Sequence, residues 1–226
     1  MASEAALARR PFWATRNGVL LAAALVSSAI AWWMIAWPPL TFANVASHPK
    51  HFALTYVHAL GGSGMLLFGG LNLYLAARND RFALHRLVGR AYLAAGAVGA
   101  LSAILVTSTM AHKPPASPIL TNATVSLLTL ALTWLAFAAL GWRAARNRRF
   151  PSHAQWMIRS YVLAWAFVFC RIASRLSDAD ELGNGEAFIW LSWIAPLIVC
   201  EIVLQWPEGA RKAPRPSSTS TRRSSS

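Results

Sequence analysis

The chain has 226 residues, of which 56% are hydrophobic and only 13% are charged, with a formal net charge of +13. A soluble domain carries about 25% charged residues. Apolar stretches of around twenty residues recur along the chain, and each is long enough to cross the roughly 30 Å hydrocarbon core of a bilayer. The composition therefore excludes an ordinary soluble domain and predicts an integral membrane protein.

Six apolar stretches predict an all-α, polytopic membrane helix bundle. Residues 1–16 form an N-terminal segment, residues 17–206 the transmembrane domain, and residues 207–226 a tail rich in Pro, Ser and Arg that is expected to be disordered. The six transmembrane helices are expected at residues 17–37, 51–77, 86–110, 119–142, 154–175 and 187–206.

Positive charge alternates between the connections. Basic residues gather before the first span, after the second and the fourth, and in the tail, whereas the other loops carry few. This is the positive-inside pattern, and it places both termini in the cytoplasm. The basicity is thus an orientation signal that would also attract anionic lipid headgroups, and a nucleic-acid partner is not expected.

The second span contains one histidine, His58, on a stripe with several glycines and Asn72. Small residues allow another helix to approach closely, which is how membrane helices usually pack. A smooth face can equally take a flat cofactor with His58 as its ligand. Packing explains the glycines but not the histidine, so both interpretations stay open.

Two further histidines are predicted near the cytoplasmic ends of helices. His85 opens the third span, where it is either a solvated interfacial residue or a ligand. Ser152 and Gln155 predict a capping box at the start of the fifth helix, which would place His153 in its first turn as a neutral, metal-binding imidazole. Arg171 lies eighteen residues further along the same face.

Ionisable residues inside a membrane are costly and need partners. Arg159 and Glu201 lie at similar depths in the fifth and sixth spans, so they are expected to form a structural ion pair. Cys170 and Cys200 differ in depth and are expected to stay reduced. His112 lies in a short outer loop, where a histidine is usually solvated.

Several motifs resemble a known family. LHRLVGRAYL in the third span, HAQWMIRSYVL with Arg171 beyond it in the fifth, and the glycine-rich helix around His58 resemble the bacterial membrane family catalogued as domain of unknown function 2306. The resemblance covers about residues 50–175 and implies a multi-pass protein of the bacterial inner membrane. It implies no activity, because the family has none established.

The arrangement also resembles the cytochrome b-five-six-one proteins, in which six helices hold two b-type haems. That resemblance implies an inner haem between His85 and His153 and an outer haem at His58. The helix predicted at 119–142 contains no histidine, so His112 is the nearby substitute for the outer haem.

Two functions follow, and whether the protein is an enzyme stays open. The first is an electron carrier with haem b bound by His85 and His153, with Arg86 and Arg90 at its propionates, Arg171 at an outer anionic group, and quinone as a redox partner. The alternative is a non-redox module (a small-molecule or lipid binder, a sensor or an accessory subunit) with a buried network of histidines and arginines. A transporter is a weaker third hypothesis, because the sequence lacks evident inverted repeats.

Overall fold

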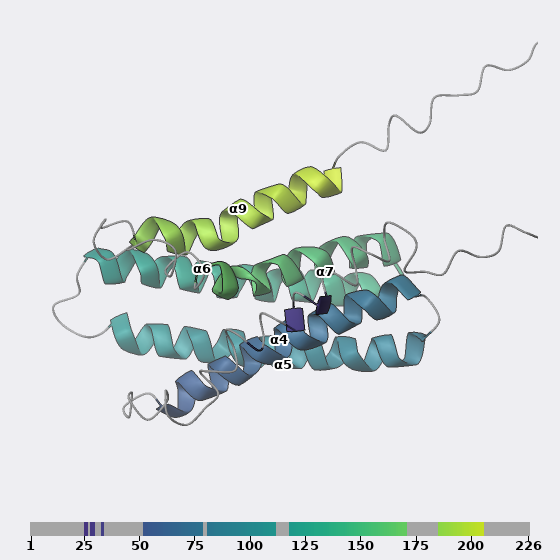
Figure 1. Cartoon of the computed structure of the whole chain (residues 1–226), viewed down its shortest axis with the longest axis horizontal. Helices are drawn as coiled ribbons and strands as arrows, with labels where there is room; N and C mark the ends of the chain where they lie inside the picture. Colours follow the sequence, from purple (N-terminus) through teal and green to yellow (C-terminus); the bar gives the residue numbers. More distant parts are fainter. Residues whose placement is uncertain are drawn as a thin grey trace, which may run out of the picture.

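The computed structural model of the chain describes residues 25, 26, 28, 29, 33, 52–78, 81–111, 118–170 and 185–205. Every regular element in these ranges is a helix (Figure 1). The helices are α4 (Phe52–Arg78), α5 (Phe82–Ala111), α6 (Pro118–Arg146), α7 (Phe150–Ala164) and α9 (Gly185–Gln205). The all-helical expectation therefore holds for the described part of the chain.

Four described helices are long and apolar enough to cross a membrane: α4, α5, α6 and α9. Helix α7 is shorter than the span predicted at 154–175, because the amide of Trp165 bonds the carbonyl of Val162, three residues back, at 3.1 Å. This tighter turn ends α7, and helical geometry resumes over residues 166–170. Most of the span predicted at 17–37 lies outside the described residues.

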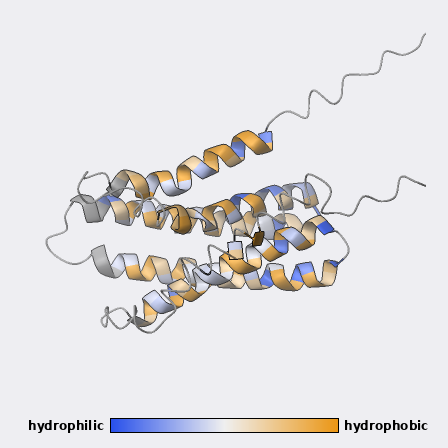
Figure 2. Ribbon diagram, viewed as in Figure 1, coloured by the Kyte–Doolittle hydropathy of each residue, from blue (hydrophilic) through white to orange (hydrophobic). Residues whose placement is uncertain are grey.

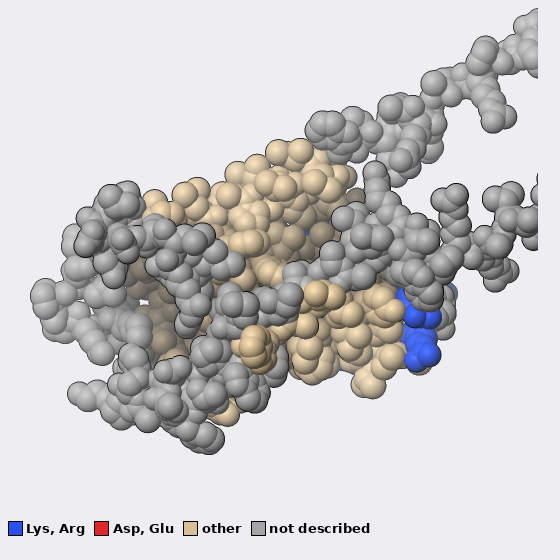
Figure 3. Space-filling model, in the orientation of Figure 1, with Lys and Arg blue, Asp and Glu red and all other residues tan. Residues whose placement is uncertain are grey.

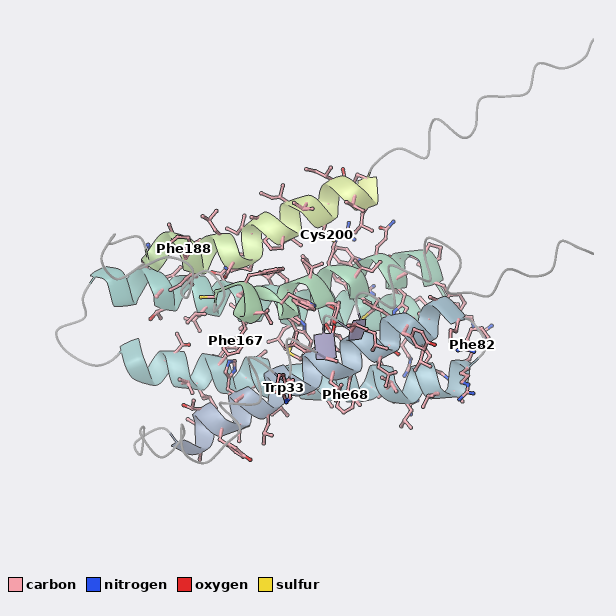
Figure 4. The ribbon with its side chains drawn as sticks, in the orientation of Figure 1. Trp33, Phe68, Phe82, Phe167, Phe188 and Cys200 are labelled. Carbon is pink, nitrogen blue, oxygen red and sulfur yellow. The ribbon has the colours of Figure 1, made fainter. Side chains whose placement is uncertain are left out.

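Helices α4, α5, α6 and α7 form a closed ring. Consecutive helices pack against each other, and α4 also packs against α7. Helix α5 therefore faces α7 across the ring. Helix α9 lies at the edge of the bundle against α6 and α7, and Figure 1 shows it leaning away toward its C-terminal end. Cys200, labelled in Figure 4, is buried on α9.

The outer surface of the bundle is apolar. Figure 2 shows that hydrophobic residues predominate along the helices, and large side chains such as Leu87, Leu132 and Val203 are more than half exposed. An apolar surface of this extent marks a membrane-facing protein. Lipid contact explains why so many large hydrophobic residues lie outside the core.

The core contains a network of hydroxyl groups and indoles that satisfy one another. Tyr92 is 1% exposed, and its hydroxyl lies 3.0 Å from the Ser160 hydroxyl and accepts a bond from the Trp134 indole at 3.2 Å. The Tyr161 hydroxyl contacts the Ser28 hydroxyl. Aromatic side chains thus fill the ring where α4, α5, α6 and α7 meet, with their polar atoms paired as burial requires.

The glycines of α4 serve close packing. A Cβ on Gly61 would lie 2.5 Å from the backbone nitrogen of Gly99 on α5, and Gly69 lies against the Tyr161 ring. A Cβ on Gly62, by contrast, would meet no neighbouring atom within 4 Å. The two helices therefore meet backbone to backbone at Gly61 and Gly99, so at these positions packing accounts for the glycines.

Arginines gather at one end of the bundle, where the connections α4–α5 and α6–α7 lie. Figure 3 shows their blue side chains at that end of the visible face. The α6–α7 turn is a Schellman motif: the Arg149 amide bonds the Ala144 carbonyl at 2.9 Å, and the Arg148 amide bonds the Ala145 carbonyl at 3.0 Å. Arg148 has a φ of 57°, the left-handed conformation that this motif needs.

Candidate functional site

The structure brings His85 and His153 together. His85 lies near the start of α5 and His153 near the start of α7, the two helices that face each other across the ring. Their ring centroids are 6.4 Å apart, and the ring planes are perpendicular. Both side chains are half-buried. Two histidines that lie far apart in the sequence thus meet inside the arginine-rich end of the bundle.

The backbone orients both rings. The Nδ1 atom of His153 lies 2.9 Å from the Gly141 carbonyl on α6, and Nδ1 of His85 lies 3.4 Å from the Asn72 carbonyl on α4. A carbonyl only accepts, so each bond requires the proton on Nδ1 and leaves the Nε2 lone pair available. Histidine ligands of metals are commonly held in this way.

The local start of α7 differs from the prediction. The helix begins at Phe150, with Arg149 at the N-cap position and no side-chain cap, so the capping box of Ser152 and Gln155 does not form. Pro151 explains the earlier start, because proline lacks an amide hydrogen and is favoured in the first turn. The His153 amide consequently bonds the Arg149 carbonyl at 2.9 Å.

His58 occupies a separate place on α4. Its Nδ1 lies 2.9 Å from the Gly99 carbonyl, and its ring meets Phe167 edge-on with centroids 6.4 Å apart. No second histidine ring meets His58 within the residues that the structure describes. His112, expected as its substitute partner, and Arg171 both lie outside the described residues.

Arg159 and Glu201 are in contact. The Arg159 guanidinium forms a bidentate ion pair with the Glu201 carboxylate, with one of the two distances at 2.9 Å. Arg159 also lies over the Trp156 ring, and Gln205 donates to Glu201 at 3.1 Å. The pair joins α7 to α9, so its geometry fits a structural role.

Arg90 lies away from the histidine pair. It is exposed in an open groove of about 360 Å³ between α5 and α6, together with Leu93, Ala94 and Trp142. Arg90 is five residues after His85, which is about 140° round the helix. The groove and the histidines therefore lie on different sides of α5.

Asn72 is a further neighbour of the histidine pair. The sequence placed it on the glycine stripe of α4 but predicted no role for it. Its backbone carbonyl faces His85, and its side-chain amide packs against Gly89, one turn after His85. The Oδ1 atom is buried without a hydrogen-bond partner. A buried orphan acceptor is unusual and marks a place where a polar group belongs, but one sequence offers no signal that singles it out.

The pair offers two imidazoles as possible ligands. Within the described residues, no group of three or more His, Cys, Asp or Glu side chains is placed to hold a metal ion. A bare transition metal usually takes three or four protein ligands. A pair of histidines instead suits a group that brings its own equatorial ligands.

Fold and site together define a helical membrane protein with a two-histidine centre at the arginine-rich end of its bundle. The chain belongs to the family described as predicted membrane protein DUF2306, whose profile matches residues 55–204. This match confirms the resemblance drawn from the motifs, and it extends beyond residue 175 to include α9. No curated protein and no solved structure matches the chain.

Proposed function

We propose that this protein is a b-type haem electron carrier of the bacterial inner membrane, with His85 and His153 as the axial ligands. The observation that carries the proposal is the 6.4 Å between their ring centroids. Metal–imidazole bonds of about 2 Å, plus about 1 Å from each nitrogen to its ring centre, put two axial imidazoles about 6 Å apart. The observed ring spacing supports this assignment.

The chain's own residues have distinct tasks in this proposal. The carbonyls of Asn72 and Gly141 would fix the tautomer of each ring, with the proton on Nδ1, and leave both Nε2 lone pairs available for the iron. Bound haem supplies one-electron chemistry, and a quinone or another redox partner would exchange electrons with it. A single haem is proposed, because His58 meets Phe167 and α6 contains no histidine.

The topology belongs to the same proposal. Six spans with both termini in the cytoplasm place the His85–His153 centre near the cytoplasmic face. The arginines at that end of the described helices support this orientation, because positively charged connections stay in the cytoplasm. Electrons would therefore enter or leave the centre on the cytoplasmic side of the membrane.

The non-redox module is the second candidate. One observation favours it: the aromatic core is satisfied internally, since the Tyr92 hydroxyl bonds both the Ser160 hydroxyl and the Trp134 indole without any added group. In this function the His85–His153 contact would be one more internal polar contact. The alternative module would then act as a sensor, an accessory subunit, or a binder of lipid or small molecules.

A visible spectrum of the detergent-purified protein separates the two functions. Protein produced with ample haem is expected to give sharp reduced bands and about one haem per chain in a pyridine haemochrome assay. His85→Ala and His153→Ala should each lose the haem, while the matched variant His58→Ala retains it; size-exclusion chromatography confirms that each variant is folded. A featureless spectrum, or equal loss in all three variants, would reject the haem proposal.

A further inference from the structure

We propose that the groove between α5 and α6 is a binding site for an anionic phospholipid. The groove is lined by Arg90, Leu93, Ala94 and Trp142. These side chains have the composition of a lipid site: a guanidinium for the phosphate, a short apolar floor for an acyl chain, and an indole, which prefers the interface. The inference is independent of whether haem binds, because the groove and the histidines lie on different sides of α5.

Among the described residues, the charge around the groove has no acidic partner. Arg86 lies one turn before Arg90, and Arg143 and Arg146 follow Trp142 on α6; all are exposed. Neither α5 nor α6 contains an aspartate or a glutamate. In the part of the chain that the structure describes, none of these four guanidinium groups makes an ion pair. An external anion is the partner that this charge pattern fits.

The depth of Arg90 favours a lipid over a soluble anion. Arg90 lies eight residues after the start of α5, about 12 Å along the helix axis. Helix α5 has 30 residues and is about 45 Å long, so it exceeds the hydrocarbon core by about 7 Å at each end. Arg90 therefore lies just inside the hydrocarbon boundary, where a charge is costly without a partner.

A headgroup phosphate resides at this boundary, and its acyl chains extend in the direction in which Leu93 and Ala94 lie. The Arg90 side chain can extend toward the interface with its aliphatic part on the groove. Trp142 is 43% exposed and lies near the end of α6, at the same level of the bundle. A soluble phosphate would meet the guanidinium but would leave the apolar floor and the indole uncovered.

Native mass spectrometry of the full chain, with phosphatidylglycerol, cardiolipin or phosphatidylcholine added, tests the site. Wild-type protein is expected to retain the two anionic lipids in preference to phosphatidylcholine. Arg90→Gln should lower that retention about fivefold, the effect of one arginine near an anionic surface. The matched control is Arg149→Gln, which removes the same charge from the exposed α6–α7 turn and should have little effect. Inorganic phosphate at millimolar concentration should not displace the lipid.

Trp142→Ala provides a second test that leaves every charge in place, and it serves if Arg90→Gln does not fold. It should also lower retention of the anionic lipids, because it removes one wall of the groove. If Arg90→Gln and Arg149→Gln lower the retention of anionic lipids equally, the effect arises from general surface charge and the proposal is overturned. Unchanged retention in Arg90→Gln, or equal retention of phosphatidylcholine, would overturn it as well.

Discussion

At the scale of single residues, two adjacent glycines of α4 have opposite surroundings. A Cβ at Gly61 would come within 2.5–2.8 Å of backbone atoms of Gly99 and Ala95, which cannot rotate away. The methyl group added by Gly61→Ala should push α4 and α5 apart and destabilise the protein by about 1–3 kcal/mol, as overpacking does. Gly62→Ala, with open space around it, should leave stability unchanged or raise it slightly through helix propensity.

Thermal denaturation of both variants in detergent measures this difference, and the apparent Tm should fall for Gly61→Ala alone. The pair is internally controlled, because each variant adds one methyl group to the same turn of the same helix. If both variants lower the Tm equally, the contact of Gly61 with α5 is not the closest approach of the two helices.

At the scale of elements, the turn between α6 and α7 holds a strained residue. Arg148 is the non-glycine residue with positive φ in the described part of the chain, and it occupies the position that glycine usually takes in a Schellman motif. Arg148→Gly should therefore stabilise the protein by about 1 kcal/mol. Arg149→Gly removes the same charge where φ is −89°, and it should give no gain. Chemical denaturation in detergent distinguishes the two variants, and a gain in both would assign the effect to charge.

The attachment of α9 gives the second prediction at this scale. Arg159 is 12% exposed and Glu201 34%, and their ion pair joins α7 to α9. Glu201→Leu should destabilise the protein by about 2 kcal/mol, because it leaves a guanidinium unpaired in the membrane. The double variant Arg159→Met/Glu201→Leu should recover most of this loss, since replacing both partners by apolar groups is often neutral. Additive losses in a double-mutant cycle would contradict a direct pair.

The elements also show which features a sequence alone reveals. The depth of Arg159 and Glu201 could be read from the span boundaries, and so could the end of the bundle that His85 and His153 share. The interruption at Trp165 could not, because residues 161–170 are apolar throughout and no Gly or Pro marks the turn. The predicted capping box was wrong for a local reason. Pro151 favours the first turn of a helix, so α7 begins at Phe150, before Ser152. Whether His58 meets a partner depends on which helices are neighbours, and hydropathy does not encode that.

At the scale of the whole molecule, charge is distributed unequally between the two ends of the bundle. The arginines at one end lie in the last turns of α4 and α6, near the start of α5, and in the α6–α7 turn at Arg148 and Arg149. At the other end, the first turns of α4 and α6 and the last turn of α5 contain no basic residue, and α9 begins with Gly185 and Glu186. Figure 4 places the exposed Phe82, the first residue of α5, at the arginine-rich end.

This asymmetry predicts the orientation in the membrane, because arginine-rich connections remain in the cytoplasm. In a background that lacks Cys170 and Cys200, Arg148→Cys should react with a membrane-impermeant maleimide only in inverted vesicles. Ala187→Cys, on the exposed start of α9 at the opposite end, should react in intact spheroplasts. Reaction of both positions from the same side would show that α9 does not run parallel to α4 and α6. A reversed pattern would place the His85–His153 pair near the outer face of the membrane.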